Sequence, residues 1–336
     1  TFIGHPGKIF TDGLPYAFAS FYALTIPFTG VLFLRRQWIL GKEYKYITPG
    51  EMYSDYYGGD TIRLLTVLVA FLFSVPYLGV QLRASGDLFN VLTDGLISTE
   101  LGMFALSAIV VIYVASGGLR SVAYVDCVQC ILLALGIIIL GCITIHFSGG
   151  WDGFKVGLSK IVTDDLASNS KITPDGYSSK VSIPGAVQLV SSGSKSIGGP
   201  WTGLMCMTYM FALMGIQSSP AFSMWSFSNK TSKAFRWQQV VASSLIIGII
   251  LFTFTIFQGL GGHILETNGI LKNVTDKNLV PQLINLMSTS APWLVGLLAV
   301  CALAAMQSTG AAYMSTFSGM VTRDVYKNYF SKEATD

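Results

Sequence analysis

The chain has 336 residues, of which 51% are hydrophobic and only 12% are charged. Charged residues make up about a quarter of an ordinary soluble protein, and the mean hydropathy here is +0.56, so the composition predicts a membrane protein. The formal net charge of +3 is small and gives no indication of a nucleic-acid partner.

The five cysteines do not indicate a disulfide framework, because their number is odd and all of them lie in or beside apolar runs. Cys127 and Cys130 form a CxxC pair, but it stands at the start of an apolar run without a second pair or a nearby histidine. Metal-binding and redox functions are therefore not predicted for this pair. We expect no cofactor.

Three apolar stretches in the first part of the chain are each long enough for a membrane helix. They cover residues 13–34, 64–86 and 99–116, and a helix needs about 20 predominantly apolar residues to cross the hydrocarbon core. In the polar connector between the first two, Thr48 before Pro49 predicts the start of a further helix, since proline is tolerated in a first turn.

The third stretch is followed by Gly117 and Gly118, which suit a tight reversal before the next span at residues 123–147. Asp126 stands at the start of that span. A carboxylate at the N-terminal end of a helix interacts favourably with the helix dipole. This structural role is one interpretation of Asp126.

The second half of the chain alternates polar loops with apolar spans. Residues 148–197 are rich in Ser, Gly, Lys and Asp and are predicted to form a long aqueous loop, as are residues 263–288. Residues 199–227 and 238–262 are apolar enough to span. The first of these two spans has polar residues and a proline in its middle, which is typical of discontinuous transporter helices. They are Gln217, Ser218, Ser219 and Pro220.

The last span, residues 291–321, contains no charge and has a stripe of small and hydroxyl residues. Ala305, Ser308 and Thr309 share one face of it near mid-membrane. The spacing leaves two interpretations open. The stripe allows close helix packing, with the hydroxyls bonded back to their own carbonyls. Alternatively, the Ala305 carbonyl and the two hydroxyls offer oxygen ligands to a small monovalent cation.

The basic residues predict the orientation of the spans, because short cytoplasmic loops collect Lys and Arg. If the spans alternate in direction, the basic clusters fall on one side, which we assign to the cytoplasm. The two long loops then fall on the external side. The basic residues of these clusters are Arg35, Arg36, Lys42, Lys45, Arg63, Arg120, Lys230, Lys233, Arg236, Arg323, Lys327 and Lys332.

Arg83 is the one arginine that this topology leaves off the cytoplasmic side. An ionisable residue at such depth is a candidate for a functional site, and its guanidinium can hold a carboxylate in bidentate fashion. Two structural alternatives stay open: an ion pair with Asp87 at i, i+4 spacing, or extension of the side chain toward the headgroups.

Three motifs together resemble the sodium:solute symporter family. The first is Ala304-Ala305-Met306-Gln307-Ser308-Thr309, and the second is Thr322-Arg323-Asp324-Val325-Tyr326-Lys327. The third extends over residues 113–129 and contains Gly117-Gly118-Leu119 followed by Asp126 and Gln129. That family includes proline, pantothenate, monocarboxylate and sugar cotransporters, and the resemblance covers essentially the whole chain.

The resemblance implies an all-α, polytopic membrane protein with a partial leucine-transporter-like, inverted-repeat helical bundle, and residues 1–336 as a single transporter domain lacking both ends. It implies that Ala305, Ser308 and Thr309 bind sodium, with the first-helix half of that site upstream of Thr1. Asp126 is then a point on the sodium release path. Substrate candidates near the break and in the second span are Gln81, Arg83, Gln217, Ser218 and Ser219.

The expected function is that of a sodium-coupled secondary active symporter that imports a small polar organic solute. Ser219-Pro220-Ala221-Phe222-Ser223-Met224-Trp225 looks most like the monocarboxylate carriers, so a monocarboxylate is the first expectation. The alternatives are proline, another amino acid or a vitamin, or a symporter-like sensor domain of a histidine kinase. An enzyme is not predicted, because catalytic motifs are missing from the sequence. We expect a multi-pass protein of a bacterial inner membrane, with the lipid bilayer, the solute and sodium as its partners.

Overall fold

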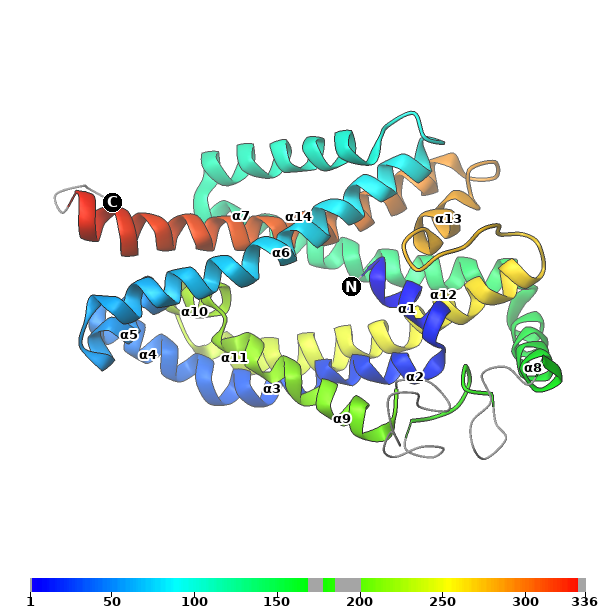
Figure 1. The fold of residues 1–336 in the computed structure, drawn as a ribbon, viewed down its shortest axis with the longest axis horizontal. Coiled ribbons are helices and arrows are strands. Elements are labelled where there is room, and N and C mark those ends of the chain that lie inside the picture. Colours follow the sequence, from blue (N-terminus) through cyan, green and yellow to red (C-terminus); the bar gives the residue numbers. More distant parts are fainter. Residues whose placement is uncertain (1, 169–177, 185–200, 332–336) are drawn as a thin grey trace.

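The computed structural model describes residues 2–168, 178–184 and 201–331, and these form a bundle of helices that lie mostly along one axis (Figure 1). The α-helices are α1 (Gly4–Asp12), α2 (Leu14–Ala17), α3 (Tyr22–Thr29), α4 (Arg35–Tyr44), α5 (Pro49–Tyr57), α6 (Asp60–Leu92), α7 (Thr99–Phe147), α8 (Gly150–Ser168), α9 (Gly203–Ala212), α10 (Pro220–Ser228), α11 (Lys233–Trp237), α12 (Ile249–Thr267), α13 (Leu279–Asn285) and α14 (Pro292–Met320). Short 3-10 or π segments, η1 (Phe18–Phe21), η2 (Gly30–Leu34), η3 (Leu213–Ser218), η4 (Gln238–Gly248) and η5 (Val321–Phe330), join some of them.

Within the described residues, five helical segments are long and apolar enough to cross a membrane. The stretch from α2 to α4 counts as one such segment, because η1 and η2 continue the helix across Pro27 without a break. A shorter apolar helix covers Gly203–Ser218. The five long segments are Leu14–Tyr44, Asp60–Leu92, Thr99–Phe147, Lys233–Thr267 and Pro292–Phe330.

Helix α7 contains two of the predicted spans and reverses between them at Gly118. That glycine has φ 59° and ψ −166°, a conformation that suits a residue without a side chain. The two limbs of α7 therefore run in opposite directions along the bundle in Figure 1. The second limb is helical directly after Gly118, so Asp126 lies about two turns inside it. The interpretation of Asp126 as an N-terminal dipole charge is therefore wrong, because the dipole effect is confined to the first turn.

The predicted aqueous loops contain helices that their polar composition conceals. Helix α8 lies within residues 148–197 and buries Phe154 and Ile161, which are spaced for one helical face, in a cluster with α12 residues. In the same way, α13 lies within residues 263–288 and is almost wholly buried. Residues 169–177 and 185–200 lie outside the described residues.

The sequence places polar residues in the middle of residues 199–227, and the helix is interrupted there. Helix α9 changes to the 3-10 segment η3, and Ser219 then adopts an extended conformation (φ −66°, ψ 150°) before α10 begins at Pro220. Pro220 at the first helical position needs no backbone hydrogen bond. The break therefore lies between two short helices that run end to end.

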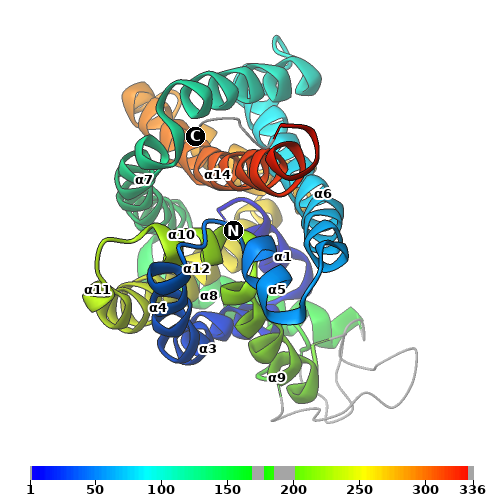
Figure 2. The same cartoon turned by 90° about the vertical axis from the view of Figure 1, so that its left-hand side faces the viewer.

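Figure 2 shows two groups of helices, with α6, α7 and α14 in one group, α3, α4 and α9 in the other, and α1, α10 and α12 between them. Helix α12 contacts both α1 and α7. Leu140, Leu298 and Ala302 are fully buried in the core of the first group. At Gly136 of α7, an added Cβ would lie 2.6 Å from the Cβ of Cys301, so the glycine permits close packing on α14.

The segments with the basic clusters lie toward one end of the bundle. Helix α5, the bend of α7 and the C-terminal end of η5 are on the left of Figure 1, whereas α8 and α13 are on the right. This is the separation that the predicted orientation requires. Which end faces the cytoplasm stays a prediction.

Replacing Gly7 by alanine should destabilise the protein, because α1 packs through Gly7 on the backbone of Asp276. An added Cβ would lie 1.8 Å from the Asp276 carbonyl oxygen, and overpacking of this kind costs about 1–3 kcal/mol. A lower midpoint of thermal unfolding in detergent is the expected result. Gly4→Ala is the control, since its Cβ would meet nothing within 4 Å. Equal tolerance of both changes would contradict this packing.

Candidate sodium and solute site

The three residues predicted to bind sodium place their oxygens together on α14. The Ser308 Oγ and the Thr309 Oγ1 each donate to the Ala305 carbonyl oxygen, and both distances are 3.3 Å. This pattern satisfies the hydroxyls within the helix, as the packing interpretation requires. However, all three residues also line a pocket of about 670 Å³. Both distances are longer than is usual for an O–H···O hydrogen bond, so these bonds are weak and leave the oxygens available to a ligand in the pocket.

The pocket beside these residues, here called the outer pocket, is bounded by α14, α6, the start of α1 and the segment around Asp276 and Lys277. Gln81 and Arg83 of α6 line it as well. The structure therefore brings two of the substrate candidates to the same cavity as the three sodium candidates, although more than 200 residues separate them in sequence.

Arg83 has one of the partners expected from its spacing. Its Nε lies 3.8 Å from Asp87 Oδ2, one turn along α6, and the Arg83 side chain is 64% exposed. An exposed pair of this length contributes about 0–1 kcal/mol. The guanidinium is therefore weakly held and can turn toward an anion in the outer pocket.

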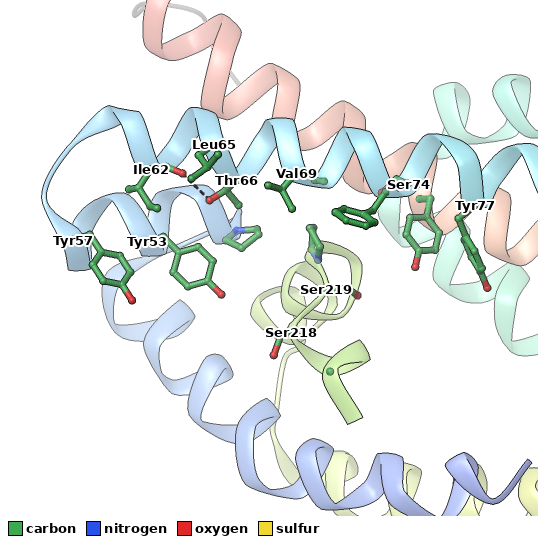
Figure 3. Close-up of a pocket in the computed structure, with 16 residues that line it drawn as sticks. Tyr53, Tyr57, Ile62, Leu65, Thr66, Val69, Ser74, Tyr77, Ser218 and Ser219 are labelled. Atoms are coloured by element: carbon green, nitrogen blue, oxygen red, sulfur yellow. Dashed lines mark hydrogen bonds between the residues drawn. The ribbon is translucent and has the colours of Figure 1, made fainter. Parts of the chain in front are cut away.

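A second pocket of about 730 Å³, here called the inner pocket, lies between α5, α6 and the break before α10 (Figure 3). Ser218 and Ser219 line it, together with Tyr53 and Tyr57 of α5. The Ser219 Oγ is buried and has no hydrogen-bond partner among the described residues. The two serines are thus in a different cavity from Gln81 and Arg83.

Gln217 lines neither pocket. It is fully buried and donates from Nε2 to the Gln239 Oε1 at 3.0 Å, and Gln239 donates in turn to the Gln238 Oε1 at 2.5 Å. The proposed role of Gln217 as a substrate contact is therefore corrected. Its side chain holds η3 against η4, because a buried amide needs hydrogen-bond partners.

Two threonines of α3 hold the other side of the broken helix, and the sequence prediction did not single them out. Thr25 donates to the Met210 carbonyl oxygen at 2.5 Å, and Thr29 donates to the Met214 carbonyl oxygen at 2.8 Å. A helix break leaves carbonyls without partners, which is costly inside a membrane. Their i, i+4 spacing within an apolar span was the available signal.

Asp126 lies on the second limb of α7, one turn before Gln129, which belongs to a hydrogen-bonded group around Gln307. Gln129 donates from Nε2 to the Gln307 Oε1 at 3.1 Å, and the Tyr113 hydroxyl donates to the Gln307 carbonyl oxygen at 3.4 Å. The Asp126 Oδ1 is buried without a hydrogen-bond partner among the described residues. The structure places Asp126 outside both pockets.

Asp126→Asn should leave folding intact and slow sodium-coupled turnover. The change keeps the shape of the side chain and removes a charge that costs free energy where it is buried without a partner. Expression and the thermal unfolding midpoint should therefore be unchanged or improved, while the maximal uptake rate falls. Loss of expression with a normal turnover in the remaining protein would assign Asp126 a structural role instead.

A polar cluster at the end of α14 was also missed by the sequence prediction. Thr48 caps α5 and accepts from the Glu51 backbone nitrogen at 3.1 Å, while its own hydroxyl donates to the Asp324 Oδ1 at 2.8 Å. The Arg323 Nε donates to the Glu51 Oε1 at 3.0 Å. The signal was the pattern Thr-x-x-Glu, which is typical of a capping box, but it gave no indication of a contact 276 residues away.

The helix reversal, the broken helix and the small-residue helix belong to an all-α, multi-pass membrane fold of the leucine-transporter-like type. The chain superposes on a Na+-coupled sialic acid symporter, solved in a substrate-bound outward-open state, with a TM-score of 0.72 and 17% sequence identity. The match covers 100% of this chain and 65% of that chain. The all-α fold class predicted from the sequence is confirmed.

The chain belongs to the sodium:solute symporter family, whose profile matches residues 1–336. The sodium/glucose cotransporter of Vibrio parahaemolyticus is 23% identical over 100% of this chain and 60% of its own length. The high-affinity proline transporter PutP of Bacillus subtilis is 22% identical over 99% and 64%. The monocarboxylate transport permease protein of Rhizobium johnstonii is 23% identical over 100% and 61%.

These comparisons confirm the family. The relatives and the fold are those of transporters and not of enzymes, as the sequence predicts. The chain spans 60% to 64% of the length of these three relatives. Their names include a sugar, an amino acid and a monocarboxylate at nearly equal identity, so they do not distinguish between substrates.

Proposed function

We propose that this chain forms part of a sodium-coupled symporter that imports a small polar organic solute across a cell membrane, the inner membrane of a bacterium. The observation that carries the proposal is the convergence of the Ala305, Ser308 and Thr309 oxygens on a pocket. Uncharged oxygens suit an ion that must bind and then leave. Sodium is the transported coupling ion in this proposal and not a resident cofactor.

The solute that we propose is a monocarboxylate. Arg83 lines the same pocket as the three sodium candidates, and its partner among the described residues is Asp87 at 3.8 Å. A guanidinium binds a carboxylate through two parallel hydrogen bonds, and the amide of Gln81 lies beside it on α6. The likeness of Ser219-Pro220-Ala221-Phe222-Ser223-Met224-Trp225 to the monocarboxylate carriers agrees with this choice.

The experiment that tests both parts is uptake of labelled solutes into proteoliposomes with and without an inward sodium gradient. The panel contains lactate, pyruvate, acetate, proline and glucose. We expect sodium-dependent uptake of a short carboxylate. Sodium-dependent uptake of proline alone would keep the symporter and change its substrate. An absence of uptake, with ligand-dependent signalling by an attached kinase module, would favour the sensor alternative.

Arg83→Gln should raise the KM for the carboxylate by about tenfold or more, because one charge-assisted bidentate contact is worth about 1.5–3 kcal/mol. The sodium concentration for half-maximal uptake should change little. Lys277→Gln is a matched control, since it removes a second exposed positive charge from the lining of the outer pocket. An unchanged KM in the Arg83 variant would exclude this residue from carboxylate binding.

A further inference from the structure

One face of α6 lines both pockets in series. Residues of this face at helical spacing border the inner pocket first and the outer pocket afterwards. They are Thr66, Val69, Phe73, Tyr77, Val80 and Ala84. Tyr77 is the one described residue that lines both pockets. The two cavities therefore meet at the Tyr77 side chain.

The Tyr77 ring contacts the ring of a second tyrosine, Tyr313, on α14. Its centroid lies 5.3 Å from that of Tyr313, and the two ring planes are inclined by 57°. Tyr313 also lines the inner pocket. Such a tilted contact is within the favourable range for aromatic pairs. It holds the rings together without a covalent or charged link, so a transport cycle can separate them.

Both tyrosines are linked to residues already placed in the outer pocket. Tyr313 follows Thr309 by four residues, so the two share one face of α14. Gln81 follows Tyr77 by four residues, so their side chains are neighbours on one face of α6. A shift of α14 on sodium binding, or of Gln81 on solute binding, is therefore transmitted directly to the ring pair.

We propose that Tyr77, closed against Tyr313, is the partition between the outer and inner pockets, and that a solute must displace it to pass from one to the other. The role of this partition in transport rests on the proposed function. The partition itself concerns access between two cavities, however, and can be tested without measuring transport. The partition admits a solute whose apolar part slides along a ring while its polar part stays near Gln81 and the serines at the break.

The test is chemical labelling of a cysteine in the inner pocket from the side of the outer pocket. Ser218→Cys is made in a protein whose five native cysteines are replaced by serine or alanine. A membrane-impermeant methanethiosulfonate reagent is added on the side of Lys277. Labelling of Lys277→Cys in the same background verifies the side and the fold.

We expect slow labelling of Ser218→Cys when Tyr77 is present, and labelling at least about ten times faster when Tyr77→Ala is added. Tyr77→Phe should keep the slow rate, because the ring and not the hydroxyl closes the path. Val69→Ala is the matched control, since it truncates the same face of α6 within the inner pocket and away from the junction.

Tyr313→Ala is the second variant and should also accelerate labelling, which covers the case in which Tyr77→Ala does not fold. Equal labelling rates in the parent and in a folded alanine variant would overturn the partition, as would equal acceleration by Val69→Ala. Sodium-dependent uptake is measured in the same vesicles. Its absence would contradict the proposed function, whereas the labelling rates would still decide the partition.

Discussion

Ser308→Ala and Thr309→Ala should each raise the sodium concentration for half-maximal uptake by about tenfold or more. A hydrogen-bonding or ligating contact to a charged group is worth about 1.5–3 kcal/mol, and each 1.4 kcal/mol corresponds to a factor of ten. Both hydroxyls now bond back to the Ala305 carbonyl, so their removal also frees that oxygen and leaves the helix intact. Uptake measured over a range of sodium concentrations gives the result.

Ser315→Ala separates an ion ligand from a packing residue. The Ser315 Oγ donates to the Ala312 carbonyl oxygen at 3.0 Å, as the two candidates do to Ala305, but Ser315 lines neither pocket. We expect its sodium dependence to equal that of the parent protein. If all three alanine variants behave alike, the stripe on α14 serves helix packing and the sodium assignment fails.

The common face of Ala305, Ser308 and Thr309 and the apolar helices could be predicted because their signals are local. Ala305, Ser308 and Thr309 are neighbours on one helix, so helical periodicity alone places them on a common face. The polar centre of residues 199–227 likewise coincides with the break at Ser219. In both cases, backbone geometry within a few turns determines the outcome.

Predictions failed where a side chain had a choice of partners from distant segments. Gln217 and Ser218 are adjacent in sequence, yet one is bonded to Gln239 and the other faces the inner pocket. Asp126 was placed at a helix start because Arg120 and Ser121 after the glycine turn concealed the helix that begins directly after Gly118. Which way a residue turns depends on tertiary packing, which hydrophobic periodicity does not contain.

The contact between Asp324 and α5 has the largest expected effect on stability. The Asp324 side chain is fully buried, and its Oδ1 accepts from Thr48 at 2.8 Å and lies 3.8 Å from the Arg63 Nε. The fit is close, since a Cβ on Gly50 would lie 2.7 Å from the Asp324 Oδ2. A carboxylate at this position therefore joins the ends of α5, α6 and α14.

Asp324→Ala should lower the free energy of unfolding by about 3–5 kcal/mol, because it leaves Thr48 and Arg63 without their buried partner. Asp324→Asn should cost less, since its amide oxygen can still accept from Thr48. Asp60→Ala is the control: Asp60 lies 4.0 Å from the same arginine, but its side chain is 58% exposed, and such pairs contribute about 0–1 kcal/mol. Denaturant unfolding in detergent measures all three variants. An Asp324→Ala protein as stable as the Asp60→Ala protein would show that the contacts of Asp324 do not hold η5, the continuation of α14, to α5.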